Sequence, residues 1–281
     1  MTREGRVPEG RGAGPLTYGV LAVFTAGSLF PLVWTAIAAS RDSTRLARTP
    51  PPFWFGDNLG RNLAVAWSDA HLGVALLNTT IVAGSVAAGT VLLSTLAGFA
   101  FAKLRFRFRN ALLAVVIGTM MVPPQLSVVP LFMLIAELSW TDRLQAVVLP
   151  ALVSAFGVFF MRQHLVRALP SELVEAARVD GASAVRVVWH VVFPAARPAM
   201  AVLGMLTFVM TWNDFFWPVV ALTQSGSPTV QVALTGLGRG YIPDQSVIMA
   251  GALLGTLPLL LVLVVFGRQI VGGIMRGAVK G

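Results

Sequence analysis

Long blocks of apolar residues, separated by short polar segments, dominate the pattern of this chain. A membrane-spanning helix needs about 20 predominantly apolar residues, and most of the blocks approach or exceed that length. All but one of them contain no charged side chain. The pattern therefore predicts six membrane-spanning helices, which in chain order are Leu16–Ala39, Val74–Ala102, Ala111–Ala136, Ala146–Met161, Pro198–Thr223 and Val247–Phe266.

The fourth block, residues 146–161, is short, and a re-entrant loop there would leave an odd number of spans. The distribution of charge favours six, because cytoplasmic segments collect Lys and Arg. With six spans and both termini in the cytoplasm, most of the 21 basic residues fall in cytoplasmic segments. The richest of these segments are Lys103–Arg109, after the second block, and Arg162–Arg197, after the fourth.

The composition agrees with a protein that is dissolved in lipid. Only 12% of the residues are charged and 56% are hydrophobic, whereas a soluble domain carries roughly 25% charged residues. The net charge of +9 is typical of nucleic-acid binding when it lies on one soluble face, but here the bases form short clusters between apolar blocks. We therefore expect a multi-pass protein of the cell (inner, cytoplasmic) membrane, with lipid and not nucleic acid as its surroundings.

These features divide the chain into three parts. Residues 1–14 form a cytoplasmic N-terminal segment, residues 15–271 a six-helix transmembrane domain, and residues 272–281 a cytoplasmic C-terminal tail. The chain has no cysteine, and its three histidines lie in separate segments without metal-ligand spacing, so we predict no metal site.

The longest cytoplasmic segment, residues 163–197 within that domain, predicts two helices. Ser171 is a suitable N-cap for the first, and Gly181 is a natural stop because glycine accepts positive φ. The second is predicted from Ser183 to Phe193, with Pro194 ending it. Such a helix–turn–helix presents a defined surface to another protein.

The same segment resembles a known family. Its Glu175-Ala176-Ala177 triplet, followed by Gly181 and later by a Phe-Pro pair, resembles the EAA loop of bacterial ABC importer permeases. That family prefers Ile and Leu where this chain has Val191 and Phe193. The wider loop sequence is similar to the carbohydrate-importing branch, and more specifically to the second permease of maltose-type systems. Two further stretches agree with that branch, namely Met121–Gln125 with Pro130, and Trp212–Pro218.

The resemblance implies a type I ABC importer permease fold and a role in coupling. Its implied partners are a second permease that forms a heterodimer with this chain, two copies of a cytoplasmic ATPase, and an extracytoplasmic solute-binding protein. The implied cargo is a sugar of di- or oligosaccharide size. The residues implied to contact the ATPase are Glu175, Ala176, Ala177, Asp180, Gly181, Ala182 and Ser183.

ATP hydrolysis is not expected in this chain. A phosphate-binding loop requires the pattern G-x-x-x-x-G-K-[ST], and the only two lysines, Lys103 and Lys280, follow Ala102 and Val279. We therefore predict a non-catalytic transport subunit without a cofactor of its own, with ATP and Mg²⁺ bound by the partner ATPase.

Polar and helix-breaking residues within the spans are candidates for the translocation pathway. Asp214 is the only acid within a predicted span, and an unpaired charge there is costly, so it lines a pathway or pairs structurally; the structural alternative is favoured. Asn78 is favoured as an interhelical hydrogen-bond partner. The glycines Gly84, Gly89 and Gly98 are predicted to permit close helix packing. The full candidate set is Asn78, Pro123, Pro124, Gln125, Trp212, Asn213 and Asp214.

Two other function classes remain as rivals. An ion-coupled secondary transporter is expected to carry ion or proton sites among its spans, often within inverted repeats, and this chain shows one intramembrane acid and no evident repeat. An intramembrane hydrolase needs a nucleophile and a base on adjacent helices, and no such pair is evident. The sequence leaves the identity of the sugar open.

Overall fold

The computed structural model describes residues 14–50, 53–223, 226–239 and 243–278, and within these ranges every regular element is helical. Of the predicted N-terminal segment only Gly14 is described, and the last helix continues into the predicted tail. The helices are α1 (Pro15–Ala39), α2 (Ser43–Leu46), α3 (Leu59–Asp69), α4 (Leu72–Lys103), α5 (Arg109–Thr119), η1 (Pro124–Ser127), α6 (Val128–Glu137), α7 (Gln145–Ala151), α8 (Ala155–Ala168), α9 (Ser171–Val179), α10 (Ala184–Val187), η2 (Val188–Val192), α11 (Phe193–Trp212), α12 (Phe216–Ala221), α13 (Val230–Leu237) and α14 (Gln245–Ala278).

Four continuous helices are long and apolar enough to cross a membrane, namely α1, α4, the merged α10–η2–α11 helix and the first 21 residues of α14. Two bent pairs, α5 with η1–α6 and α7 with α8, each pass the same test when taken together. Counting each pair as one span gives six. The six predicted spans and the all-α membrane fold are thus confirmed in order and type.

The third and fourth spans are both bent, and the third bends at a pair of prolines. The two halves of the third meet at 92°, at a corner occupied by Pro123 and Pro124. The fourth bends by 41°, and its second half restarts at Ser154, whose hydroxyl accepts a hydrogen bond from the backbone N–H of Gly157 at 3.0 Å. The prediction of a helix through residues 111–136 therefore misses a right-angled corner.

The fifth span corrects two predicted boundaries. Pro194 does not end the helix that begins after Ser183, because the helix continues from Ala184 to Trp212 without a break. Proline removes one backbone donor and crowds the preceding turn, and here the wider π turn η2 lies immediately before it. The helix ends at Trp212 and not at Thr223, since a short break separates α11 from α12.

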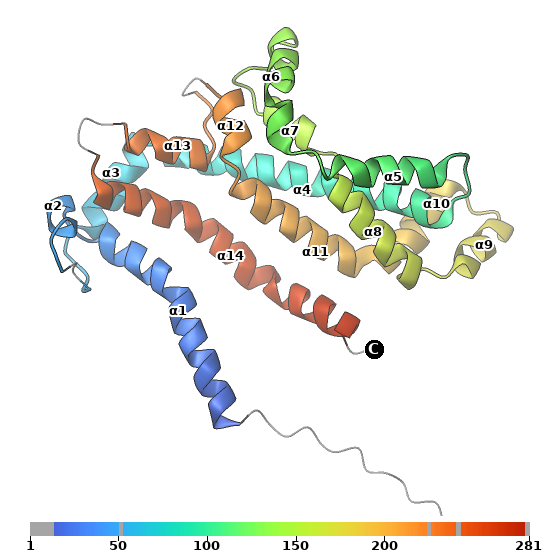
Figure 1. The fold of residues 1–281 in the computed structure, drawn as a ribbon, viewed down its shortest axis with the longest axis horizontal. Helices are drawn as coiled ribbons and strands as arrows, with labels where there is room; N and C mark the ends of the chain where they lie inside the picture. The colour runs from blue at the N-terminus through green and yellow to red at the C-terminus, as the bar shows by residue number, and fades with distance from the viewer. Residues whose placement is uncertain (1–13, 51–52, 224–225, 240–242, 279–281) are drawn as a thin grey trace, which may run out of the picture.

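The long helices run side by side along the longest axis of the molecule (Figure 1). At one end lie α9 and α10, and at the other lie α2 and α3. The charge pattern places the α9 end in the cytoplasm. Helices α4 and α8 approach closely, because a Cβ added to Gly98 would lie 2.8 Å from the backbone nitrogen of Arg162. Gly89 also closely faces a neighbour, Leu152, whereas no atom of the described chain lies within 4 Å of a Cβ added at Gly84, so the packing role predicted for Gly84 finds no partner within this chain.

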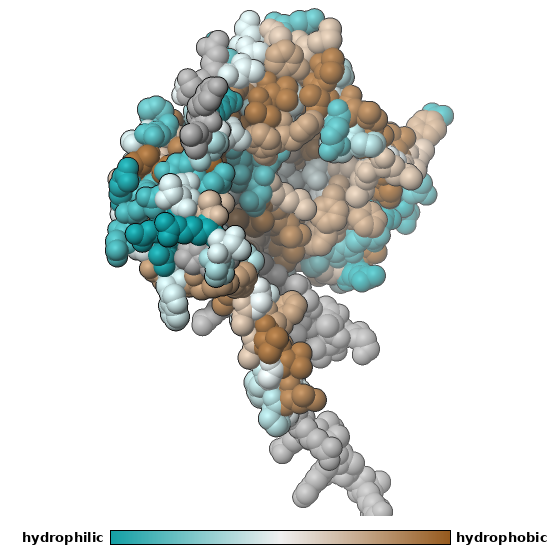
Figure 2. Space-filling model, turned by 60° about the vertical axis from the view of Figure 1, so that its left-hand side comes forward, coloured by the Kyte–Doolittle hydropathy of each residue, from teal (hydrophilic) through white to brown (hydrophobic). Residues whose placement is uncertain are grey.

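Helix α1 stands apart from the other spans for most of its length. Only Ile37, Ala38 and Ala39, at its C-terminal end, are buried. There the Asn62 side-chain amide donates to the carbonyls of Ala39 and Arg41, at 2.9 and 2.8 Å. The rest of the helix exposes a continuous apolar surface, seen as the largely brown rod that projects from the body in Figure 2.

Candidate coupling loop and pathway residues

The first helix of the cytoplasmic loop, α9, is short and amphipathic. It begins at Ser171 with Pro170 in the cap position, so Ser171 is not the N-cap that the sequence predicts, and no side chain caps this end. Glu172 lies in the first turn as expected, where the positive end of the helix dipole favours an acid. The capping serine of this loop is Ser183, whose hydroxyl accepts a hydrogen bond from the N–H of Arg186 at 3.3 Å.

The turn after α9 is a Schellman motif. Gly181 has φ of +75°, which is the left-handed conformation that glycine adopts at little cost. Its N–H donates to the carbonyl of Arg178 at 3.0 Å, and the N–H of Ala182 donates to the carbonyl of Ala177 at 2.9 Å. These are the two bonds that define the motif. The prediction that α9 stops at Gly181 through positive φ is therefore confirmed.

The loop is packed onto the membrane-spanning helices by a shared apolar core. Val174 of α9 and Val187 of α10 are both buried, and both belong to one cluster with residues of α4, α8 and α11. Ala177 and Ala182, on either side of the turn, pack against the same cluster. Two of the candidate contact residues therefore support the fold of the loop from within.

The opposite face of the loop is exposed. Glu175, Ala176, Asp180 and Ser183 all lie on it, and the Glu175 carboxylate makes no ion pair or hydrogen bond with any other described residue. An exposed carboxylate beside a small alanine suits a charge-assisted contact with a basic group of another protein. Within the described chain that contact is not made.

Two exposed apolar residues of α9 are not among the contact residues predicted from the sequence. Leu173 is 53% exposed and Val179 is 87% exposed. Exposed apolar side chains on a short helix with an acidic residue between them suit a protein contact surface. The signal was present in the apolar residues around the acidic triplet, but the sequence alone does not say which of them turn outward.

The pathway candidates fall into three separate groups, and no hydrogen bond joins one group to another among the described residues. Asn78 is buried, and its side chain donates to the carbonyl of Pro228 at 3.1 Å. Pro228 lies in the loop before α13, so the bond joins a helix to a loop and not two helices as the sequence predicts. The prolines Pro123 and Pro124 and the amide of Gln125 lie exposed at the corner of the third span. The third group surrounds the end of α11.

That third group forms a corner at which α11 is bonded to α14 and α12 to α7. The indole N–H of Trp212 is buried and donates to the carbonyl of Gly255 on α14 at 3.1 Å, and that of Trp217 donates to the carbonyl of Ala146 on α7 at 2.9 Å. Between them, the Asp214 carboxylate accepts from the N–H of Phe216 at 3.1 Å. Asn213 is exposed, and its amide donates to the carbonyl one turn earlier.

No three or more His, Asp or Glu side chains gather into a possible metal site within the described ranges.

Comparison with known proteins places this arrangement in a family. Residues 90–274 match the family described as binding-protein-dependent transport system inner membrane component. The lactose transport system permease protein LacG of Rhizobium radiobacter is 32% identical over 263 residues, which cover 94% of this chain and 95% of LacG. The sn-glycerol-3-phosphate transport system permease protein UgpE of Yersinia enterocolitica is 30% identical over 268 residues, covering 92% and 93% of the two chains.

A solved structure shares the fold. It is the crystal structure of a bacterial ABC transporter involved in the import of the acidic polysaccharide alginate, and it superposes with a TM-score of 0.77 over 90% of this chain and 94% of that one, at 20% identity. The predicted ABC importer permease fold and inner-membrane location are confirmed by these matches. The chain belongs to the family of binding-protein-dependent transport system inner membrane components and is a permease subunit of that family.

Proposed function

We propose that this permease carries a sugar of di- or oligosaccharide size into the cell, as one of two permease subunits driven by a separate ATPase. LacG, which is named for the disaccharide lactose, supports this size of cargo, whereas UgpE is named for sn-glycerol-3-phosphate, a smaller phosphorylated polyol. Both cargoes are rich in hydroxyl groups. Uptake assays with each compound distinguish between these two kinds of cargo.

The observation that carries the proposal is the exposed outer face of the coupling loop. Its outward face presents Leu173, Glu175, Ala176 and Val179, and its inward face is fixed to the spans by Val174. A surface that is rigidly supported and left without a partner in its own chain suits contact with a cytoplasmic protein. In this family that protein is the ATPase, which supplies ATP and Mg²⁺ binding.

The remaining proposed partners are a second permease, with which this chain forms a heterodimer, two copies of the ATPase, and an extracytoplasmic solute-binding protein. The long exposed surface of α1 supports a second membrane-embedded chain, because the other helices of this chain cover only its C-terminal end. The proposed heterodimer thus accounts for a helix that its own chain does not cover.

The sugar pathway is proposed to use exposed amides and not buried ones. Gln125 and Asn213 are exposed near helix breaks, where hydrogen-bonding groups lie among otherwise apolar residues. By contrast, Asn78 and Trp212 are buried, and each donates to a backbone carbonyl of another part of the fold. We therefore assign positioning roles to these two.

The test is ATP-driven uptake by the assembled transporter. The chain is co-expressed with its neighbouring permease, ATPase and binding protein, reconstituted in vesicles, and assayed with labelled lactose and sn-glycerol-3-phosphate. Uptake that requires both ATP and the binding protein supports the proposal. Uptake by this chain alone, abolished by a protonophore and indifferent to ATP, would instead establish the secondary-transporter alternative.

A further inference from the structure

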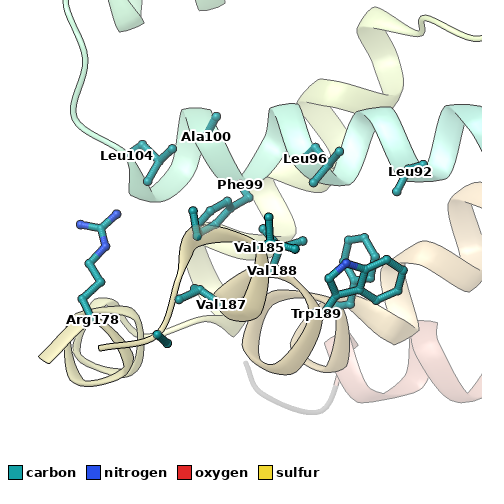
Figure 3. A pocket seen from close by; sticks show the side chains of 13 residues that line it. Leu92, Leu96, Phe99, Ala100, Leu104, Arg178, Val185, Val187, Val188 and Trp189 are labelled. Carbon is teal, nitrogen blue, oxygen red and sulfur yellow. The ribbon is translucent and has the colours of Figure 1, made fainter. Parts of the chain in front are cut away.

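An apolar groove runs between the cytoplasmic half of α4 and the helix that follows the coupling loop (Figure 3). Its volume is about 500 Å³. From α4 it is lined by Leu92, Leu96, Phe99, Ala100 and Leu104, and Val185, Val188 and Trp189 face them from α10 and η2. The groove is open on one side, and Val185 and Trp189 are 66% and 60% exposed.

One charged side chain lines this groove, at its cytoplasmic end. The guanidinium of Arg178 stands beyond Leu104, where α4 finishes (Figure 3). It forms no ion pair or hydrogen bond with any other described residue. Three further basic residues lie close by in the sequence, namely Lys103, the last residue of α4, and Arg105 and Arg107, which follow it. The planar fork of arginine suits a phosphate oxygen.

The length of the groove corresponds to one leaflet of a membrane. From Leu92 to Leu104 the rise along α4 is about 18 Å, and half of a bilayer's hydrocarbon core is about 15 Å. With Arg178 placed at the cytoplasmic surface, the apolar side chains of the groove reach the depth of the acyl chains of that leaflet. Trp189, with its amphipathic ring, borders the same stretch, as tryptophans do near membrane interfaces.

We propose that this groove binds one anionic phospholipid of the cytoplasmic leaflet. Its phosphate contacts Arg178 and one acyl chain lies along α4 toward Leu92. The lipid would contact α9 and α10 of the coupling loop and α4 at the same time. The proposal rests on the membrane location and the fold, and it does not depend on which cargo is carried.

The absence of cysteine from the chain allows a direct test with a single label. Val185→Cys places a bimane fluorophore in the groove, and Leu261→Cys, at an exposed position of α14, is the matched control. The assembled transporter is placed in phosphatidylcholine vesicles that contain increasing amounts of a bromine-bearing lipid, either phosphatidylglycerol or phosphatidylcholine. Bromine quenches the label only where the acyl chains contact it.

At Val185→Cys we expect half-maximal quenching at about fivefold less phosphatidylglycerol than phosphatidylcholine, since one arginine near an anionic headgroup contributes about that preference. At Leu261→Cys the two lipids should quench alike. Arg178→Gln should abolish the preference, and Arg178→Lys should restore much of it. Because the readout is lipid contact, the test holds even where Arg178→Gln impairs transport.

Equal quenching by the two lipids at Val185→Cys would show ordinary surrounding lipid and overturn the proposal. Absence of quenching by either lipid would overturn it too, because it would show that a partner subunit covers the groove. ATP-driven uptake measured in the same vesicles reports separately on the proposed transport function. A failure of lipid selectivity with normal uptake therefore leaves the transport proposal standing.

Discussion

Replacement of Gly181 by valine tests whether the shape of the coupling loop is needed for transport. Nothing lies within 4 Å of the position where a Cβ would be added, so the substitution creates no clash with neighbours. Its effect comes from the backbone, which is at φ +75°. A β-branched residue is a true outlier in that conformation.

The structure allows an estimate of the effect. The left-handed conformation costs an L-residue about 1–2 kcal/mol, which corresponds to a factor of roughly 5–30 in the population of the native turn. A turn that relaxes loses the bond from the Ala182 N–H to the Ala177 carbonyl, and with it the fixed start of α10. We expect ATP-driven uptake to fall by up to that factor in Gly181→Val. Gly181→Asn should retain most uptake, because asparagine tolerates this conformation.

The assay compares uptake with ATP hydrolysis in reconstituted vesicles of the full transporter. Gly60→Ala is the control, since Gly60 is also exposed with open space around it but lies in α3 at the opposite end of the molecule. Wild-type uptake in Gly181→Val, with an unchanged number of ATP molecules consumed per cargo, would refute the reasoning. So would an equal loss in Gly60→Ala.

Three further substitutions test the fold. Gly98→Val should destabilise the α4–α8 contact by about 1–3 kcal/mol through overpacking, lowering the thermal unfolding temperature in detergent, whereas Gly84→Val, which faces open space, should not. Trp212→Phe should cost about 1 kcal/mol because it removes the hydrogen bond between the indole and α14; unchanged thermal unfolding would count against that bond. Hydrogen bonds from the backbone N–H and the hydroxyl of Thr44 hold the pKa of Asp42 below its usual range, so the cap of α2 contributes at neutral pH and is lost as pH falls through that lowered pKa. Asp42→Asn should remove this acid-side dependence, as followed by NMR titration of the loop.

The spans were predictable because a long apolar segment in lipid must satisfy its own backbone hydrogen bonds, and the helix is the structure that does so. Their bends were only partly predictable. Proline marks where a backbone bond is lost, yet Pro123 and Pro124 accompany a 92° corner while Pro194 lies within a helix that continues. The difference depends on whether the preceding turn can widen, as η2 does, and on which neighbours satisfy the freed carbonyls. Both depend on tertiary packing and so cannot be predicted from the local sequence.

The coupling loop shows the same division between local and tertiary information. The turn at Gly181 was predictable, because a left-handed residue after a helix is a local requirement that glycine meets. The assignment of the N-cap to Ser171 was wrong, since two serines flank the loop and only Ser183 accepts a capping bond. The outward position of Leu173 and Val179 depends on how α9 rotates against the core, which residue identity does not specify.

The contact of Trp212 at the end of α11 could not be predicted from the sequence either. Trp212 and Asp214 were candidates for the pathway because polar groups within spans are costly. The partner of Trp212 is a backbone carbonyl of α14, and a backbone partner carries no sequence signal. Asp214 accepts from a backbone N–H two residues later, so its local role is to cap the break. Both observations favour the structural alternative.

Two structural features connect the coupling loop to the opposite side of the membrane, namely a shared buried cluster and an unbroken helix. Val174 and Val187 share one buried cluster with Leu203 of α11. A displacement of the loop is therefore transmitted to α11. The helix that leaves the loop then runs unbroken from Ala184 to Trp212, a length of about 43 Å, and a tilt of about 5° at one end would move the other by about 4 Å. Because Trp212 is bonded to α14, that displacement reaches a second span directly. A partner that binds the loop differently in two states would therefore shift the whole helix pair between two positions, which is the physical requirement for coupling.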